Sequence, residues 1–240
     1  MNLNLNLASS PPDVADRLMI CDCDGVLIDS EAVAARVLIE ELHALWPGVD
    51  VEPVVMPLLG LRIEAVLGST AETLNRTIDA AQIDSIRRAV EAAAVQAPAV
   101  AGIAEALAAI PVRKACASNS FAPYVETVLK RTGLVRFFGE RRFTADMVAN
   151  PKPAPDVYLA AARTLRVSAE HCLVVEDSVT GVTAAKAAGM AVLGFIGGGH
   201  ATEGQIEALR RVGASVVFDD MTRLPALVGE WLQSATFEIR

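Results

Sequence analysis

Apolar residues recur along this chain with two different spacings. Short apolar runs, of the kind that form strands buried on both faces of a parallel sheet, alternate with longer stretches of helical, three-or-four-residue periodicity. The first run, residues 18 to 23, predicts the first strand. Further strands are predicted at residues 113–117, 142–145, 172–175, 191–195 and 216–218.

Helical periodicity occupies the stretches between and after these later runs. The predicted helices span residues 103–109, 123–132, 154–165, 181–188, 203–211 and 224–233. Strand–helix alternation with short loops is typical of α/β proteins in which right-handed crossovers place helices over a parallel sheet. We therefore predict a Rossmann-like parallel sheet core covered by helices on both faces.

Residues 31 to 98 break this alternation, because they contain no strand signal. A helix is predicted over 31–46, where Pro47-Gly48 ends it, and a turn or short helix over 54–60. Residues 62 to 97 are again helical, with breaks expected near Gly68-Ser69 and Ile83-Asp84. This pattern predicts an α-helical cap domain inserted into the core.

The predicted domains follow from these boundaries. Residues 17–30 and 99–240 form the α/β core, residues 31–98 form the helical cap, and residues 1–16 form a flexible N-terminal tail. The tail lacks the basic start and the apolar stretch of a signal peptide.

Composition and charge narrow the class of protein. The chain has 240 residues, of which 52% are hydrophobic, and a formal net charge of −8. Such a chain can bury a large core but carries no basic stripe for nucleic acid, and no apolar run is long enough to span a membrane. Its four cysteines lie in strand-like runs without zinc-site spacing, so we expect buried thiols and a cytoplasmic location.

Two aspartates, Asp22 and Asp24, end the first predicted strand, with Gly25 directly after them. Ligands of open α/β sheets bind at the carboxyl ends of the strands. Period-two alternation would place both carboxylates on the same side, where they would repel each other. A hard divalent cation such as Mg²⁺ would offset that repulsion, whereas the alternative interpretation is an ordinary Asp-Gly turn.

Polar residues also follow two later strands and occupy one proline-rich loop. Ser118 and Asn119 follow the strand at 113–117; Lys152 lies among three prolines in residues 150–156; Glu176 and Asp177 follow the strand at 172–175. Taken singly, each is also compatible with ordinary turns, helix caps or a surface loop.

Together, in this order, the four segments resemble the four motifs of the haloacid dehalogenase-like hydrolases. The matching segments are Asp22-Cys23-Asp24-Gly25-Val26, Ser118, Lys152-Pro153-Ala154-Pro155, and Glu176-Asp177-Ser178-Val179-Thr180-Gly181. The resemblance covers about residues 17 to 235.

The resemblance implies a role for each motif residue. Asp22 would attack phosphorus, Asp24 would act as general acid and base, and Ser118, Asn119 and Lys152 would contact the phosphoryl group. Mg²⁺ would be held by Asp22, the Asp24 carbonyl and Asp177, with Glu176 at the metal or behind its ligands. From these roles we expect a low pKa for Asp22 and an Asp24 side chain that points toward the cap.

The resemblance leaves several activities to be weighed. Haloacid dehalogenases in the strict sense lack an acid at the position of Asp24. Sugar phosphomutases of the β-phosphoglucomutase type carry a histidine on the first cap helix, where this chain has Val33 and Ala34. Arg62 resembles the substrate-directed arginine of hexose and hexitol phosphatases. An inactive binding or regulatory protein is the alternative from another class.

These considerations predict a Mg²⁺-dependent phosphatase that hydrolyses a small phosphate monoester through an aspartyl-phosphate. The expected partner is a small phosphorylated metabolite, such as a sugar or sugar-alcohol phosphate. Nucleic acid and membranes are not expected as partners, and the chain is expected to be a monomer or weak dimer.

Overall fold

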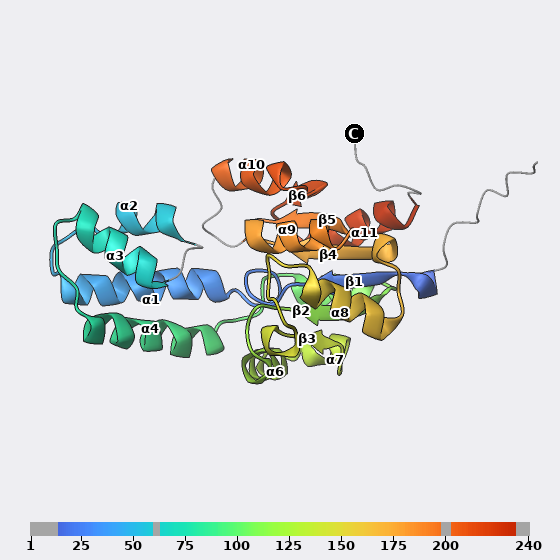
Figure 1. Cartoon of the computed structure of the whole chain (residues 1–240), viewed down its shortest axis with the longest axis horizontal. Helices are drawn as coiled ribbons and strands as arrows, with labels where there is room; N and C mark the ends of the chain where they lie inside the picture. The colour runs from blue at the N-terminus through green and yellow to red at the C-terminus, as the bar shows by residue number, and fades with distance from the viewer. Residues whose placement is uncertain (1–13, 60–62, 198–202, 234–240) are drawn as a thin grey trace, which may run out of the picture.

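The computed structural model describes residues 14–59, 63–197 and 203–233 (Figure 1). Within these residues the chain forms one parallel sheet with the order β3-β2-β1-β4-β5-β6. The strands are β1 (Leu18–Cys21), β2 (Arg113–Ala117), β3 (Arg142–Phe143), β4 (Cys172–Glu176), β5 (Ala191–Phe195) and β6 (Val216–Phe218). The predicted α/β class with a parallel sheet is therefore confirmed.

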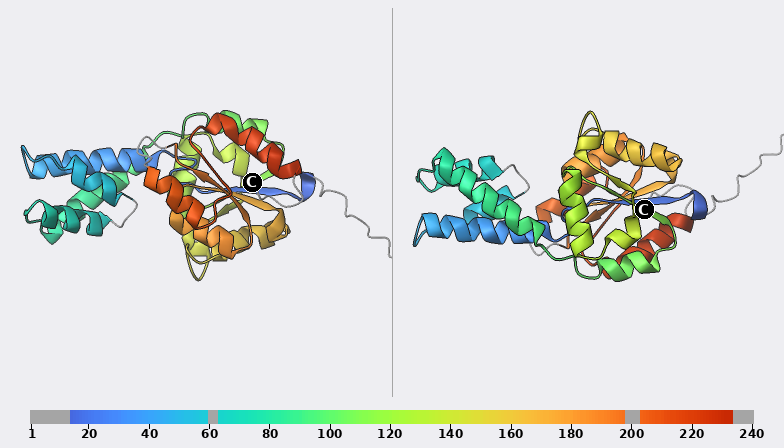
Figure 2. Two further views of the ribbon diagram at one scale, coloured as in Figure 1. Left: turned by 90° about the horizontal axis from the view of Figure 1, so that it is seen from above. Right: turned by 90° about the horizontal axis from the view of Figure 1, so that it is seen from below.

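Helices cover both faces of this sheet, as the two views of Figure 2 show. The alternation of β1 explains why: Met19 and Cys21 enter one apolar cluster, and Leu18 and Ile20 enter the other. The first cluster includes side chains of α5 (Ile103–Ala109), α6 (Ala122–Arg131), α7 (Val135–Phe138) and α11 (Leu224–Gln233). The second includes side chains of α8 (Asp156–Leu165), α9 (Val179–Ala187) and α10 (Glu203–Arg211).

A separate helical lobe lies beyond the carboxyl ends of the strands (Figure 1). It contains α1 (Ser30–Leu45), α2 (Glu52–Val55), α3 (Ile63–Thr73) and α4 (Ala80–Val95), with a 3-10 turn at Met56–Leu58. The lobe has its own apolar cluster, built around Leu42, Val55 and Leu67. Its described residues contain no strand, as the sequence predicted.

The two segments that join the lobe to the core run side by side. Ile28 and Ala99 form an antiparallel bridge, and the Asp29 amide donates to the Pro98 carbonyl at 2.9 Å. The lobe is therefore inserted without separating the parts of the core on either side of it.

Several predicted boundaries are wrong. Gly68-Ser69 and Ile83-Asp84 lie inside α3 and α4, and the chain breaks instead between Thr73 and Ala80. Asp79 starts α4 with a capping box in which it exchanges hydrogen bonds with Gln82, a sequence signal that the periodicity alone overlooks.

Smaller differences concern the core. The strand predicted at 142–145 ends at Phe143, because the Thr144 hydroxyl donates to Asp146 in a 3-10 turn. Helix α7 was not predicted, since its four residues are too few to show periodicity. All four cysteines are buried and free, as expected. Among the described residues, no helix is both long and apolar enough to cross a membrane.

Candidate active site

The carboxyl ends of three adjacent strands form the candidate site. Cys21 at the end of β1 pairs with Cys116 of β2 on one side and with Val175 of β4 on the other. The residues that follow these strands therefore meet at one sheet edge, where open α/β sheets bind ligands. They line a cavity of about 230 Å³ together with Asp24, Glu31, Asn119, Ser120, Lys152, Ser178 and Thr180.

Lys152 is the only ammonium group among the described residues that line this inner cavity. Its Nζ donates to Asp22 Oδ1 at 2.5 Å, to Glu176 Oε1 at 2.7 Å and to the Ala117 carbonyl at 2.9 Å. An ammonium has three N–H donors, so all of them have protein acceptors. Burial would lower the pKa of Lys152, but Asp22 and Glu176 outweigh it and raise the pKa well above its ordinary value. Lys152 therefore stays charged and holds Asp22 in place.

Asn119 fixes the loop that carries Lys152. Its side-chain carbonyl accepts from the Lys152 amide at 2.8 Å, and its side-chain NH₂ donates to the Lys152 carbonyl at 3.0 Å. Both ends of the Asn119 amide are thus engaged by the Lys152 backbone. Ser118 is buried at the end of β2, and its hydroxyl accepts from the Ser120 amide at 3.0 Å.

Glu176 is fully buried and accepts four hydrogen bonds. Tyr158 and Lys152 donate to Oε1, and both the amide and the hydroxyl of Ser178 donate to Oε2. Burial would raise the pKa of Glu176, but the charge of Lys152 and these hydrogen bonds hold it below its ordinary value. Because a carboxylate offers about four acceptor positions, this hydrogen bonding favours a role behind the metal ligands over direct ligation.

Asp22, Glu176 and Asp177 bring carboxylate oxygens within 4.8 Å of one another. Three carboxylates beside one ammonium leave an excess of buried negative charge, which a divalent cation with oxygen ligands would neutralise. Gly25 contributes to this arrangement: with φ of 76°, it lies so close to the Asp177 carboxylate that any side chain there would overlap it. The residues therefore fit a hard cation such as Mg²⁺.

The pKa values show the same excess of negative charge. Burial raises the pKa of Asp22 to about 8, although Lys152 acts in the opposite direction. Burial, followed by the charges of neighbouring carboxylates with Glu31 first, raises the pKa of Asp177 well above its ordinary range. The expected low pKa of Asp22 assumed a bound Mg²⁺ beside Lys152, and it stays a prediction for the metal-bound protein. Without a cation, Lys152 alone does not overcome desolvation.

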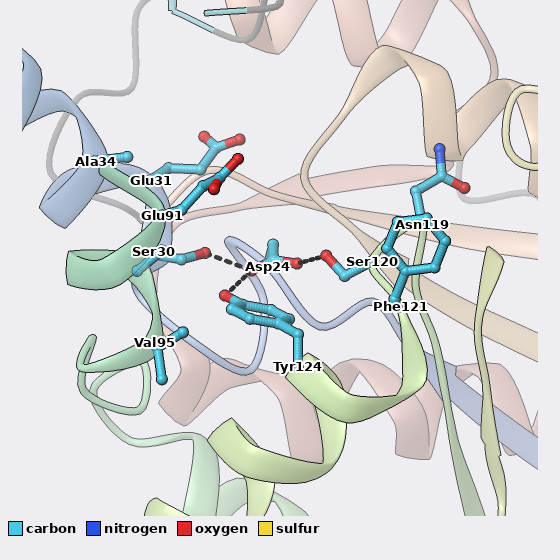
Figure 3. A pocket seen from close by; sticks show the side chains of 11 residues that line it. Asp24, Ser30, Glu31, Ala34, Glu91, Val95, Asn119, Ser120, Phe121 and Tyr124 are labelled. Atoms are coloured by element: carbon cyan, nitrogen blue, oxygen red, sulfur yellow. Dashed lines mark hydrogen bonds between the residues drawn. The ribbon is translucent and has the colours of Figure 1, made fainter. Parts of the chain in front are cut away.

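Asp24 occupies a different environment from Asp22. Tyr124 and Ser30 donate their hydroxyls to Asp24 Oδ1 at 2.6 and 2.7 Å, and Ser120 donates to Oδ2 at 2.8 Å (Figure 3). We expected strand alternation to place Asp22 and Asp24 on the same side. This expectation is wrong, because β1 ends at Cys21 and neither aspartate belongs to the strand. The Asp24 side chain is directed toward the base of the helical lobe, since Ser30 is the first residue of α1.

A larger cavity of about 640 Å³ adjoins the inner one and lies between the core and the lobe. Both cavities are lined by Asp24, Glu31, Asn119 and Ser120. In the outer cavity, α1 contributes Ala34, α4 contributes Glu91, Ala94 and Val95, and the core contributes Phe121 and Tyr124 (Figure 3). The two cavities together could hold a phosphate and an organic group attached to it.

Most of the site residues predicted from the sequence thus come together around the inner cavity. Arg62, predicted to contact substrate from the cap, lies outside the described residues. The sequence reasoning missed the three hydroxyls around Asp24 and the role of Tyr158 behind Glu176. Ser120 could have been found from its place in Ser118-Asn119-Ser120, whereas no spacing connects Tyr124 or Tyr158 with an acidic partner far away in the chain.

Comparison with known proteins shows the family to which the chain belongs. A family model described as haloacid dehalogenase-like hydrolase matches residues 17–189. The chain is 25% identical to 6-phosphogluconate phosphatase of Escherichia coli K12 over 75% of this chain and 82% of that protein. It is 31% identical to hexitol phosphatase B of the same organism, over 71% of this chain and 79% of that protein.

Among solved structures, a HAD family hydrolase from Deinococcus radiodurans with bound phosphate and sodium is similar to this fold. It superposes with a TM-score of 0.80 at 32% identity, over 92% of this chain and 97% of the other. Only 8% of this chain lies outside the superposition, which is less than the share of the chain that forms the lobe. The similarity therefore includes part of the helical lobe as well as the core.

Proposed function

Because the chain belongs to the haloacid dehalogenase-like hydrolases and is a phosphatase, we propose that its substrate is a small phosphate monoester, with Mg²⁺ as cofactor. The relatives named for a sugar-acid phosphate and a hexitol phosphate support a sugar or sugar-alcohol phosphate as the substrate class. A cytoplasmic location and a monomeric or weakly dimeric state remain predictions of the sequence.

One observation carries the proposal: two aspartates separated by one residue are held by opposite kinds of partner. Asp22 is fixed by an ammonium beside further carboxylates, whereas Asp24 is surrounded by hydroxyls at the edge of the outer cavity. The first setting suits a nucleophile that must be ionised, and the second suits a group that exchanges a proton with the leaving oxygen.

The reaction follows from these positions in two steps. A carboxylate oxygen of Asp22 attacks phosphorus, the bond to the ester oxygen breaks, and protonated Asp24 gives its proton to that oxygen, so that an alcohol leaves. Asp24 then accepts a proton from a water molecule as that water attacks phosphorus. The aspartyl-phosphate bond breaks, inorganic phosphate is released and the Asp22 carboxylate is restored.

Asp22, Asp177 and the Asp24 carbonyl would hold Mg²⁺. When bound, the cation supplies positive charge that screens the phosphate from the carboxylates and stabilises charge on the phosphoryl oxygens. Glu176 would orient Lys152 from behind, and Lys152 would keep Asp22 aligned for attack.

We further propose that residues 31–98 act as a cap over the site. The adjoining outer cavity and the contact between Ser30 and Asp24 support this role, since both involve the base of the lobe. Closure would exclude water and set Asp24 beside the leaving group. Phosphomutases of the type that this chain resembles carry a histidine on the first cap helix, where α1 has Val33 and Ala34. No described residue that lines the outer cavity is a histidine, which favours hydrolysis.

The proposal is tested by incubating the purified protein with p-nitrophenyl phosphate and a panel of sugar and sugar-alcohol phosphates, with Mg²⁺ or with excess chelator. We expect phosphate release only with the metal, and none from Asp22→Asn. Interconversion of sugar phosphates without release would indicate a mutase. If the protein hydrolyses none of these esters under any condition, the inactive binding protein is indicated instead.

A further inference from the structure

Phe121 lines the outer cavity, and neither the packing of the core nor the start of its helix explains a phenylalanine there. We infer that its ring is a binding surface for the leaving group, so that the site prefers phosphate monoesters whose leaving group contains a ring with an apolar face, such as a pyranose sugar. This inference rests on the proposed phosphatase function, because it assumes that the outer cavity receives the organic part of the ester.

The first observation is that Phe121 does not contribute to the apolar core. Its side chain is 66% exposed, although phenylalanine is among the residue types that are most often buried. The described residues that form the three apolar clusters do not include it. Single exposed apolar side chains are common on protein surfaces, so this exposure indicates a binding role only together with the position of the residue.

The second observation concerns the helix that Phe121 precedes. Phe121 occupies the N-cap position of α6, where Ser, Thr, Asp or Asn normally accepts a hydrogen bond from the first turn, and its side chain makes no such bond. The amide of Ala122 donates instead to Asp146 Oδ1 at 3.2 Å, and Pro123 has no amide hydrogen. Because the start of α6 is capped from another loop, the side chain of Phe121 is not needed there.

The third observation is the place of Phe121 in the site. It directly follows residues 118–120, which line the inner cavity where the phosphate would bind. It lines the outer cavity from the core, whereas Ala34, Ala94 and Val95 line that cavity from the lobe (Figure 3). A group attached to the bound phosphate would therefore lie between an aromatic ring and a wall of apolar side chains.

The flat apolar face of a phenyl ring suits a leaving group of matching shape. In a pyranose with equatorial hydroxyls, such as glucose, both faces of the ring carry only C–H groups, and these pack against an aromatic surface. An acyclic polyol has similar hydroxyls but no fixed face, and its carbon chain loses rotational freedom when it binds. Phe121 should therefore favour a cyclic leaving group over an acyclic one of similar composition.

The inference is tested with glucose 6-phosphate and sorbitol 6-phosphate. Both are esters of a primary alcohol and are uncharged away from the phosphate, so they differ mainly in the presence of the ring. We measure kcat, KM and the melting temperature for wild-type protein and for Phe121→Ala, Phe121→Tyr and Met147→Ala. Met147 is a matched control, because it too is an apolar side chain of the core that is largely exposed, at 60%, but it is not among the described residues that line either cavity.

We expect wild-type protein to hydrolyse glucose 6-phosphate with the higher kcat/KM. Phe121→Ala should lower kcat/KM for this ester by about three- to tenfold, mainly through KM, because the ring contact is made in the ground state as well as in the transition state. It should affect sorbitol 6-phosphate less and should not lower the melting temperature. Phe121→Tyr, which keeps the ring, and Met147→Ala should both retain the wild-type preference.

An equal or higher kcat/KM for sorbitol 6-phosphate in wild-type protein would overturn the inference, as would an equal loss for both esters in Phe121→Ala. A marked fall in the melting temperature of Phe121→Ala would assign the residue to the fold instead. p-Nitrophenyl phosphate covers the case in which neither hexose ester is hydrolysed. Its leaving group is a flat ring, so an unchanged kcat/KM for it in Phe121→Ala would refute the inference alone, whereas a protein that hydrolyses no ester refutes the function on which the inference rests.

Discussion

Without a bound cation, this protein should become less stable as the pH rises from 5 to 8. Asp22 has a native pKa of about 8, against about 3.9 for an aspartate in an unfolded chain. Over this interval the native state retains a proton that the unfolded state has lost. Since the native pKa is the higher one, the stabilisation is complete below the unfolded pKa and disappears as the pH rises through the native pKa.

The magnitude follows from the number of pH units crossed. One proton retained over three pH units changes the free energy of unfolding by about 4 kcal/mol, at 1.36 kcal/mol per unit. For a chain of this size the melting temperature should fall by about 10 °C. Asp177 should act in the same direction, because its pKa is also raised.

Thermal and urea unfolding in excess chelator at pH 5 and pH 8 measure this loss. Asp22→Asn should show a much smaller pH dependence, whereas Asp50→Asn, at an exposed position of the lobe, should behave like the wild-type protein. Mg²⁺ at a hundred times its dissociation constant should restore about 2.7 kcal/mol at pH 8. It should restore less at pH 5, where protons compete for the ligands. Equal stability at both pH values in chelator, or an equal loss in Asp22→Asn, would refute the reasoning.

Four further predictions concern single side chains. Asp22→Asn should abolish incorporation of labelled phosphate into the protein, and label on any other residue would contradict its role as nucleophile. Asp24→Asn should lower the turnover of sugar phosphates by about 10²- to 10⁴-fold but that of p-nitrophenyl phosphate far less, whereas equal losses would rule it out as the leaving-group acid. Tyr124→Phe should lower the turnover of sugar phosphates by about tenfold and that of p-nitrophenyl phosphate less, because it removes one of three hydrogen bonds to Asp24. An equal loss for both leaving groups would argue for a purely structural role. Lys152→Met should cost about 3–5 kcal/mol in urea unfolding at pH 8 without metal, because it leaves Asp22 and Glu176 buried without a counter-charge, and unchanged stability would contradict this.

The core was largely predictable from the sequence because β1, β4 and β5 are buried almost throughout and therefore appear as continuous apolar runs, and the stretches between the later strands have helical periodicity. Strands β2, β5 and β6 have the bounds that the sequence predicted. The lobe was harder, since its helices are rich in alanine and their breaks are set by capping. Gly68 is tolerated inside α3 with open space around it, whereas Asp79 starts α4 through a local hydrogen bond.

Some residues of the candidate site could also be predicted from the sequence, and others could not. Residues that directly follow a strand, such as Asp22 and Ser118, could be placed from the sequence, because the sheet brings strand ends together. Tyr124 and Tyr158 could not, because they meet Asp24 and Glu176 only through the packing of α6 and α8 against the sheet. The raised pKa of Asp22 likewise depends on burial, which the sequence does not specify.

The paired segments at the base of the lobe bear on how proteins of this kind can diversify. Because Ile28 and Ala99 are bridged, any inserted sequence starts and finishes at the same two neighbouring points of the sheet edge. A lobe of different length or composition can then be exchanged, by recombination or by design, without shifting Asp22, Lys152 or Asp177. The lobe, which we propose meets the leaving group, can therefore change in sequence without moving the strand ends that we propose bind the phosphate.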